Sequence, residues 1–333
     1  MTSDADLGAR LRAAKLRALA ADVVGALPDG VDASPLGGGA ALRHGATGVV
    51  LVGAAGAERA LGPALAWALR AEVTTLHVLA DDPDAAGVLA RRAGLFDLDV
   101  RVHVVEGRET RAATPAPHLP VLEPARGALE AAEPLREAGA TIVVEHGVVL
   151  AELDGLEIGR VTDGPDGPTL EVGVGRFDRE AAAVMEAVRG HDELTAGIFA
   201  AVRTHRRTDA SPHLLNRIGR ARWLRADLLA DPGRVGARDL VVVEPPLPRD
   251  NLLDPVPASA LGRTDGGTVV VTASVGVDLD LVPTAADTRD RHDPAAELVL
   301  ALPARDRYPV VGDLAARLRR PARIVAVAGS WPS

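Results

Sequence analysis

The sequence lacks cysteine altogether. This absence excludes disulfide bonds, cysteine nucleophiles and zinc sites built on thiolates. Aromatic residues make up only 2% of the chain, so the core must be built from alanine, valine and leucine. Lysine occurs once, as Lys15, and arginine supplies the rest of the positive charge. With abundant alanine, glycine and proline, this usage is typical of GC-rich coding, so the number of arginines does not by itself indicate a partner.

The chain also lacks a long apolar run. No segment approaches the roughly 18–20 apolar residues that a membrane-spanning helix needs. The start, MTSDADLGARLRAAKLRALAADVV, predicts an amphipathic helix and has no uncharged apolar centre of the kind found in signal peptides. A net charge of −9 argues against a dedicated, sequence-independent nucleic-acid binder, although a local basic groove stays compatible with it. We therefore expect a cytoplasmic protein without a membrane partner.

Two regions have the same pattern of short apolar runs and helical segments. In the first, residues 48–107, the runs are GVVLVGAA, VTTLHVLAD and VRVHVVEG. In the second, residues 267–329, they are GTVVVTASVG, AELVLALPA and ARIVAVAG. Runs that are apolar throughout are typical of parallel strands covered on both faces, so each region predicts a βαβαβ unit with right-handed crossovers. Two alternatives explain the similarity. One is an internal duplication, and the other is the general likeness of any two α/β segments.

A different module lies between these units. Pro-rich stretches flank it at residues 114–127 and 244–257, and DGPDGP, at residues 163–168, is a strong hairpin signal. The elements expected within it are a helix at 128–138, closely spaced strands at 141–153, 155–163 and 169–175, and helices at about 178–189, 193–208 and 211–230.

The expected fold class is therefore α/β, with two βαβαβ units of largely parallel strands, a central antiparallel β-hairpin module and an Arg-rich helical segment. The chain has 333 residues, enough for two domains or for one large α/β domain with an insert. The expected divisions are residues 1–113 for the N-terminal helix and first unit, 114–127 for a linker, 128–243 for the central module, 244–257 for a second linker and 258–333 for the second unit.

The first candidate site is the turn in LVGAAGAERALG, residues 51–62. Gly53 and Gly56 would lie between a strand and a helix, where backbone amides bind phosphate with help from the helix dipole. The full G-x-G-x-x-G fingerprint is missing and no Walker lysine follows. The alternative is a tight turn whose small residues serve helix–sheet packing.

The second candidate is in the central module, whose order of helix, hairpin, strand with a carboxylate, and helix resembles the restriction-endonuclease-like, PD-(D/E)xK, fold. The resemblance implies Mg²⁺ held by Asp154 (or Glu157) and by Glu171, because a hard divalent ion needs oxygen ligands. The family's E-x-K triplet is here Glu-Val-Gly, so its lysine is missing. Arg176 or Arg179 would supply charge, but a guanidinium stays protonated and manages protons poorly.

Two further resemblances carry less chemistry. The βαβαβ units resemble the later half of the same nuclease fold, where an apolar strand leads to a helix and another strand. The segments GLEIGRV, LEVGVGRFDREA and VGVDLDLVP resemble those of a conserved family of uncharacterised bacterial proteins, a resemblance that implies no activity.

A third candidate is SVGVDLDLVP, residues 274–283, in which Asp278 and Asp280 follow an apolar strand. The carboxyl edge of a parallel sheet is where α/β proteins bind ligands, and D-x-D can hold a metal. However, side chains at i and i+2 point apart. Asp278 is also well placed to cap the helix that follows.

The fourth candidate is the Arg-rich segment at residues 203–234. On a helical projection, Arg217 and Arg225 fall within an apolar arc, whereas Arg220 and Trp223 lie outside it. A buried arginine needs a carboxylate or an anion. These two arginines are therefore internal ion-pair partners or line a pocket for a phosphate or carboxylate. Candidate internal partners are Glu152, Asp154, Glu157 and Glu171.

These patterns favour a catalytically degenerate, nuclease-like or Rossmann-like protein that binds an anion: a nucleotide, a phosphate or a nucleic-acid end. Glu171, Arg176, Arg179 and the Arg217–Arg225 helix would meet it. The enzyme alternative is a Mg²⁺-dependent nuclease that uses Asp154 and Glu171. A third alternative is a scaffold or assembly protein that forms homo-oligomers. His205 and His213, eight residues apart, are only a weak metal signal.

Overall fold

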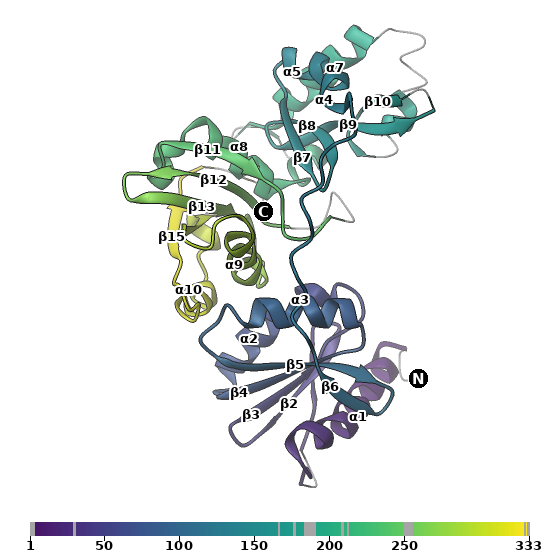
Figure 1. Ribbon diagram of the computed structural model, residues 1–333, viewed down its shortest axis with the longest axis vertical. Helices are drawn as coiled ribbons and strands as arrows, with labels where there is room; N and C mark the ends of the chain where they lie inside the picture. The colour runs from purple at the N-terminus through teal and green to yellow at the C-terminus, as the bar shows by residue number, and fades with distance from the viewer. Residues whose placement is uncertain are drawn as a thin grey trace. The chain divides into compact units, whose positions relative to one another are not determined.

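The computed structural model describes residues 4–28, 31–165, 167–175, 178–182, 191–207, 210–211, 213–249, 256–329 and 331. It confirms an α/β fold, in which helices accompany sheets with both parallel and antiparallel strands (Figure 1). Contacts divide the chain into two compact units. Unit 1 comprises Met1–His118, Leu279–Asp287 and Tyr308–Ala322, and unit 2 comprises Leu119–Asp278, Thr288–Arg307 and Arg323–Ser333.

Unit 1 contains a sheet of six strands whose spatial order follows the chain order. The strands are β1 (Ser34–Leu36), β2 (Gly39–His44), β3 (Thr47–Leu51), β4 (Thr75–Ala80), β5 (Asp99–Glu106) and β6 (Glu109–Ala112). The three central strands β3, β4 and β5 are parallel, and the outer pairs are antiparallel. Helices α2 (Leu61–Arg70) and α3 (Pro83–Ala93) join the parallel strands, which confirms the first βαβαβ unit.

Helix α1 (Asp4–Val24) packs on this sheet through its second half. Leu16, Leu19 and Ala20 recur at helical spacing and are buried against apolar side chains of β2 and β3. A short 3₁₀ turn, η1 (Ala57–Arg59), precedes α2. Unit 1 also includes α10 (Pro309–Ala316) and the first part of α9 (Leu281–His292).

The first sheet of unit 2 is an antiparallel meander with the order β10-β9-β8-β7. Its strands are β7 (Thr141–Glu145), β8 (Val148–Leu153), β9 (Leu156–Gly164) and β10 (Gly167–Val172). One face packs apolar residues such as Ala151 and Ile158 against Leu135 and Phe199. Leu135 belongs to a short helix, α5 (Glu133–Glu137), which follows α4 (Ala128–Ala131), and Phe199 belongs to α7 (His191–His205).

The second sheet of unit 2 has five strands, again in chain order. They are β11 (Asp239–Val243), β12 (Ala258–Thr264), β13 (Gly267–Ala273), β14 (Glu297–Pro303) and β15 (Arg323–Val327). Strands β13, β14 and β15 are parallel, which confirms the second βαβαβ unit, and β11 and β12 extend it in antiparallel fashion. The two βαβαβ units lie in separate sheets. In both units, a helix and two antiparallel strands precede the first parallel strand. An internal duplication would explain this shared order, and it stays a prediction.

The expected helix at 211–230 is not continuous. A 3₁₀ turn, η2 (Leu214–Asn216), comes first, and α8 (Arg220–Ala230) begins only after Gly219. Gly219 adopts a left-handed conformation with φ of 58°, which interrupts any helix entering from the N-terminal side. Part of the expected helix at 178–189 lies outside the described residues. Over the described ranges, none of the helices combines the length and apolar character required to cross a bilayer.

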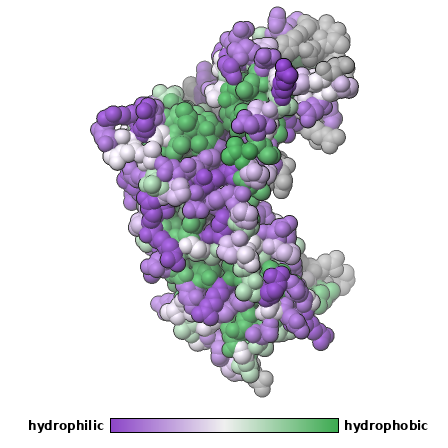
Figure 2. Space-filling model, viewed as in Figure 1, coloured by the Kyte–Doolittle hydropathy of each residue, from purple (hydrophilic) through white to green (hydrophobic). Residues whose placement is uncertain are grey.

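The surface carries both hydrophilic and hydrophobic patches (Figure 2). Large apolar side chains exposed in unit 2 include Val121 and Leu122 in the first Pro-rich stretch and Val241 on the edge strand β11.

Candidate functional site

A small pocket lies in unit 1 where β3 ends. Its volume is about 170 Å³, and its lining includes Gly37 and Gly38 from the β1–β2 turn and Gly53, Gly56 and Arg59 from the segment after β3. The two glycines of the first sequence candidate therefore border one pocket, at the carboxyl edge of a parallel strand. The same edge is where open α/β sheets bind ligands.

The backbone geometry also explains why each of these two positions is glycine. A Cβ atom on Gly53 would lie 2.7 Å from the carbonyl oxygen of Gly38, so only glycine permits this close approach of the two turns. Gly56 has a φ of 63°, the left-handed conformation that glycine adopts without steric cost. The tight-turn alternative is thus satisfied at both positions, and the turn it produces forms the wall of the pocket.

Backbone amides and one arginine border the pocket. Among the described residues, none of the backbone amides of residues 53–57 donates a hydrogen bond to another backbone group. Arg59 lines the pocket, and none of its described lining residues carries a carboxylate. Successive amides next to an arginine make up the kind of site that binds phosphate.

The proposed nuclease pair, Asp154 and Glu171, is not brought together. Asp154 lies exposed in the turn between β8 and β9, and partial desolvation raises the pKa of its carboxyl group. Glu171 on β10 pairs in register with Arg160, four residues beyond the start of β9 at Leu156. At 3.3 Å per residue, roughly 13 Å of strand separates the two positions.

Glu171 makes local contacts instead of facing Asp154. It accepts a hydrogen bond from Thr162 Oγ1 at 3.1 Å, and its Oε2 lies 3.3 Å from Arg179 Nε. Glu157, the alternative to Asp154, is buried, with Arg160, Arg179 and Arg249 within 3.1 to 3.5 Å. Arg176 lies outside the described residues. Across the part of the chain that is described, no group of three or more histidines and carboxylates could hold a metal ion.

Helix α8 carries two buried arginines that are bound to carboxylates of the meander. Arg225 Nη2 donates to Glu152 Oε2 at 2.5 Å, and Arg222 Nη2 donates to Glu145 Oε1 at 2.7 Å. Arg222 also donates to Glu152 Oε1. Burial by itself would raise the pKa of Glu152, but Arg225 and Arg222 outweigh it and hold the pKa at about 2. The ion-pair alternative therefore describes Arg225, with Glu152 as its partner.

Two expectations for this segment need correction, and one buried arginine was missed. Arg217 is exposed, because it precedes α8 and is not on its buried face. Trp223 is 3% exposed and packs in the core of the five-stranded sheet, with the Arg206 guanidinium 5.0 Å from its ring centroid. Arg222 was not a candidate, although it makes more carboxylate contacts than Arg225.

Asp280 serves the interior of unit 1. It immediately precedes α9, so it, and not Asp278, occupies the position before the helix. Asp280 Oδ2 accepts hydrogen bonds from Thr284 Oγ1 at 2.8 Å and from Arg92 Nη1 at 3.0 Å. Arg92 also donates to Asp287 at 2.9 Å. At least one member of the D-x-D pair, Asp280, is therefore engaged in a buried ion pair.

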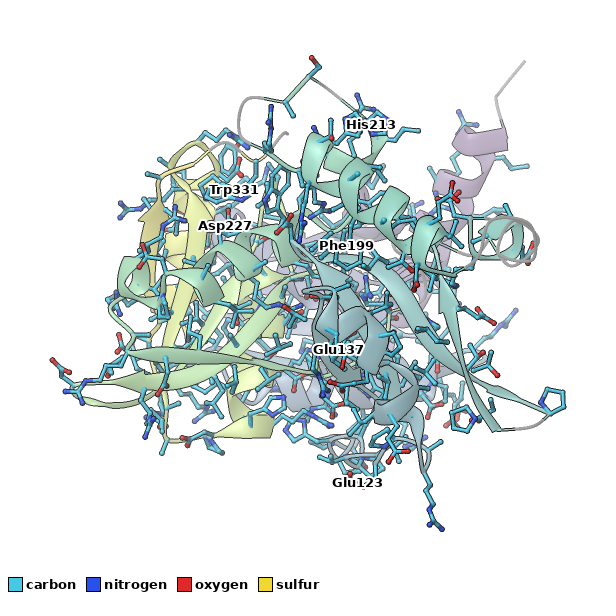
Figure 3. The ribbon with its side chains drawn as sticks, turned by 90° about the horizontal axis from the view of Figure 1, so that it is seen from above. Glu123, Glu137, Phe199, His213, Asp227 and Trp331 are labelled. Atoms are coloured by element: carbon cyan, nitrogen blue, oxygen red, sulfur yellow. The ribbon has the colours of Figure 1, made fainter. Side chains whose placement is uncertain are left out.

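The structure brings together two pairs of histidines. His205 and His213 (the latter labelled in Figure 3) stack with ring centroids 3.7 Å apart. His213 Nδ1 accepts a hydrogen bond from the Leu215 amide. His77 and His103, on neighbouring strands of unit 1, have Nδ1 and Nε2 3.0 Å apart. The second pair was missed, since two histidines 26 residues apart show no motif.

Comparisons of the chain with protein-family models, with curated proteins and with solved structures found no match.

Proposed function

We propose that the protein binds a small phosphate-bearing anion in the pocket after β3. The observation that carries the proposal is the arrangement of Gly53, Gly56 and Arg59 around one pocket without a lining carboxylate. The backbone amides of this turn would donate to phosphate oxygens, and the Arg59 guanidinium would supply a charge-assisted hydrogen bond.

The size of the pocket limits the ligand. A volume of about 170 Å³ is below the roughly 300–1,000 Å³ typical of sites that enclose a drug-sized ligand. The pocket would therefore hold a single phosphate or pyrophosphate group. The remainder of a nucleotide or another phosphate ester would extend beyond it.

A binding role fits the described residues better than magnesium-dependent cleavage. The carboxylates required for Mg²⁺ are separated in the sequence candidate. The glutamates of the meander, Glu145, Glu152, Glu157 and Glu171, each have an arginine partner. Strands β2, β3, β12 and β13 offer no substitute, because none of them contains Asp or Glu. We therefore favour the degenerate binder over the nuclease.

Calorimetric titration with pyrophosphate at constant ionic strength tests the proposal. We expect saturable binding that becomes at least tenfold weaker in Arg59→Gln. Arg70→Gln is the matched control, because Arg70 is an exposed arginine in the last turn of α2 that does not line the pocket. Absence of binding at millimolar pyrophosphate, or equal affinity in Arg59→Gln, would contradict the proposal.

A further inference from the structure

A second pocket, a groove of about 380 Å³, lies between α5 and α7 in unit 2. The α7 residues that line it are Asp192, Thr195, Ala196, Phe199, Ala200 and Arg203. Their spacing of three, four, seven, eight and eleven residues from Asp192 places them on one stripe of the helix. Pro134 and Ala138 line the groove from the α5 side.

The groove has an apolar floor and a rim of small residues. Phe199, labelled in Figure 3, is 5% exposed, whereas Ala196 and Ala200 are exposed. Thr195 is 8% exposed, and its buried hydroxyl has no hydrogen-bond partner among the residues that are described.

Opposite charges mark the two ends of the stripe. Asp192 and Arg203 are both exposed, and eleven residues at 1.5 Å per residue place them about 16 Å apart along the helix axis. Neither lies within ion-pair distance of another described side chain, and the Arg203 charge also acts on Asp154, where it opposes the rise in that residue's pKa. The Arg203 guanidinium lies 5.5 Å from the centroid of the Phe199 ring, which directs it along the groove.

We propose that this groove is the interface of a symmetric homodimer in which two copies of α7 pack antiparallel. The positions paired across the two-fold axis would be Asp192 with Arg203, Thr195 with Ala200, and Ala196 with Phe199. All three pairs are centred on the same point, between residues 197 and 198, so one axis satisfies them together. Such an isologous contact repeats each favourable pair twice.

The charge pattern selects a second copy as the occupant. An antiparallel copy places Asp192 of each subunit against Arg203 of the other, which satisfies both ends of both grooves. The alanines on the rim allow the helix axes to approach within the 8–10 Å usual for packed helices. The Phe199 side chain would then contact the open side of the opposite Ala196.

Charge reversal tests the dimer by sedimentation velocity over a range of protein concentrations. We expect the wild-type chain of 34.4 kDa to form a dimer. Asp192→Arg alone and Arg203→Asp alone should each weaken self-association at least tenfold, because each places like charges together. The double variant Asp192→Arg, Arg203→Asp should restore the wild-type affinity.

Glu193→Arg is the matched control, since it makes the same charge change at an exposed position of α7 that is not in the groove. It should leave self-association unchanged. Circular dichroism of each variant checks that the fold is intact. We expect an intact fold because Asp192 and Arg203 are both exposed. A monomer at all concentrations, single variants that dimerise normally, or a double variant without rescue would each overturn the proposal.

Discussion

Arg225 donates a hydrogen bond to Glu152 over 2.5 Å between Nη2 and Oε2, and both side chains are almost completely buried. Arg222 binds the other oxygen of the same carboxylate. Glu152 thereby fixes α8 to the meander through two guanidinium groups. A buried ion pair is poor evidence of net stability, but removal of one partner leaves an uncompensated charge.

Glu152→Gln should therefore lower the free energy of unfolding by about 3–5 kcal/mol, because two buried arginines lose their shared counter-charge. Urea unfolding followed by circular dichroism measures the change. Asp239→Asn is the control, since the Asp239–Arg263 pair is solvent-exposed and should contribute little. Equal effects of the two substitutions would contradict this account.

The same carboxylate should make stability sensitive to acid. The pKa of Glu152 in the folded protein is about 2, below its ordinary value of 4.5, so the unfolded chain binds its proton first as the pH falls. The contribution of Glu152 is fully present above pH 4.5 and is lost between there and about pH 2. In Glu152→Gln the decline in the free energy of unfolding over this range should be shallower, as measured by urea titrations at successive pH values.

The histidine pair of unit 1 should act at a higher pH. Burial lowers the pKa of both His77 and His103; the charges of His103 and Arg101 also lower that of His77, and Arg101 also lowers that of His103. Asp99 opposes the shift at His77, and Asp22, on α1, opposes it at His103.

Because both pKa values lie below 6.5, the unfolded chain binds protons first, so stability falls as the pH drops below 6.5. Urea unfolding at pH 7.5 and 5.5 should show this loss. It should be smaller in His103→Gln, whereas His44→Gln, on β2 of the same unit, serves as the histidine control. Identical pH dependence in wild type and His103→Gln would refute the assignment.

Trp331 anchors the C-terminal strand region of unit 2. It is 1% exposed, and its indole nitrogen donates to Asp227 Oδ2 at 2.9 Å (Figure 3). Trp331→Ala should cost about 3–5 kcal/mol through the cavity that it creates. Trp331→Phe keeps most of the side-chain volume but leaves Asp227 without its donor. It should therefore lower the free energy of unfolding less than Trp331→Ala does, and the difference between the two variants separates the packing contribution from that of the hydrogen bond. Thermal unfolding of both variants measures the difference.

Much of the fold could be predicted from the sequence. Apolar runs such as residues 48–52 and 269–273 are buried on both faces, and their alternation with helical segments identifies parallel strands. Strands β1, β2, β6, β11 and β12 were not predicted. Short antiparallel strands such as β2, GAALRH, mix glycine, alanine and charged residues and carry no strong period. Strand partners also depend on tertiary packing, so the sequence pattern left the number of sheets open.

The candidate site was only partly predictable. The helical projection assumed a single apolar face and a continuous helix, but α8 is covered on two sides. Trp223 and Leu224 pack in the core of the five-stranded sheet, while Arg222 and Arg225 bind carboxylates of the meander. Local periodicity cannot reveal a second buried face made of ion pairs. Gly53 and Gly56 were identifiable because the strand–turn–helix order is local.

The most direct test of phosphate binding follows the backbone amides of the turn after β3. In ¹H–¹⁵N correlation spectra, pyrophosphate should shift the amide signals of Gly53, Ala55 and Gly56 in a saturable manner, and Arg59→Gln should weaken the response. If these three signals stay unchanged while the protein is titrated to millimolar pyrophosphate, the turn does not bind phosphate and the proposed function is wrong.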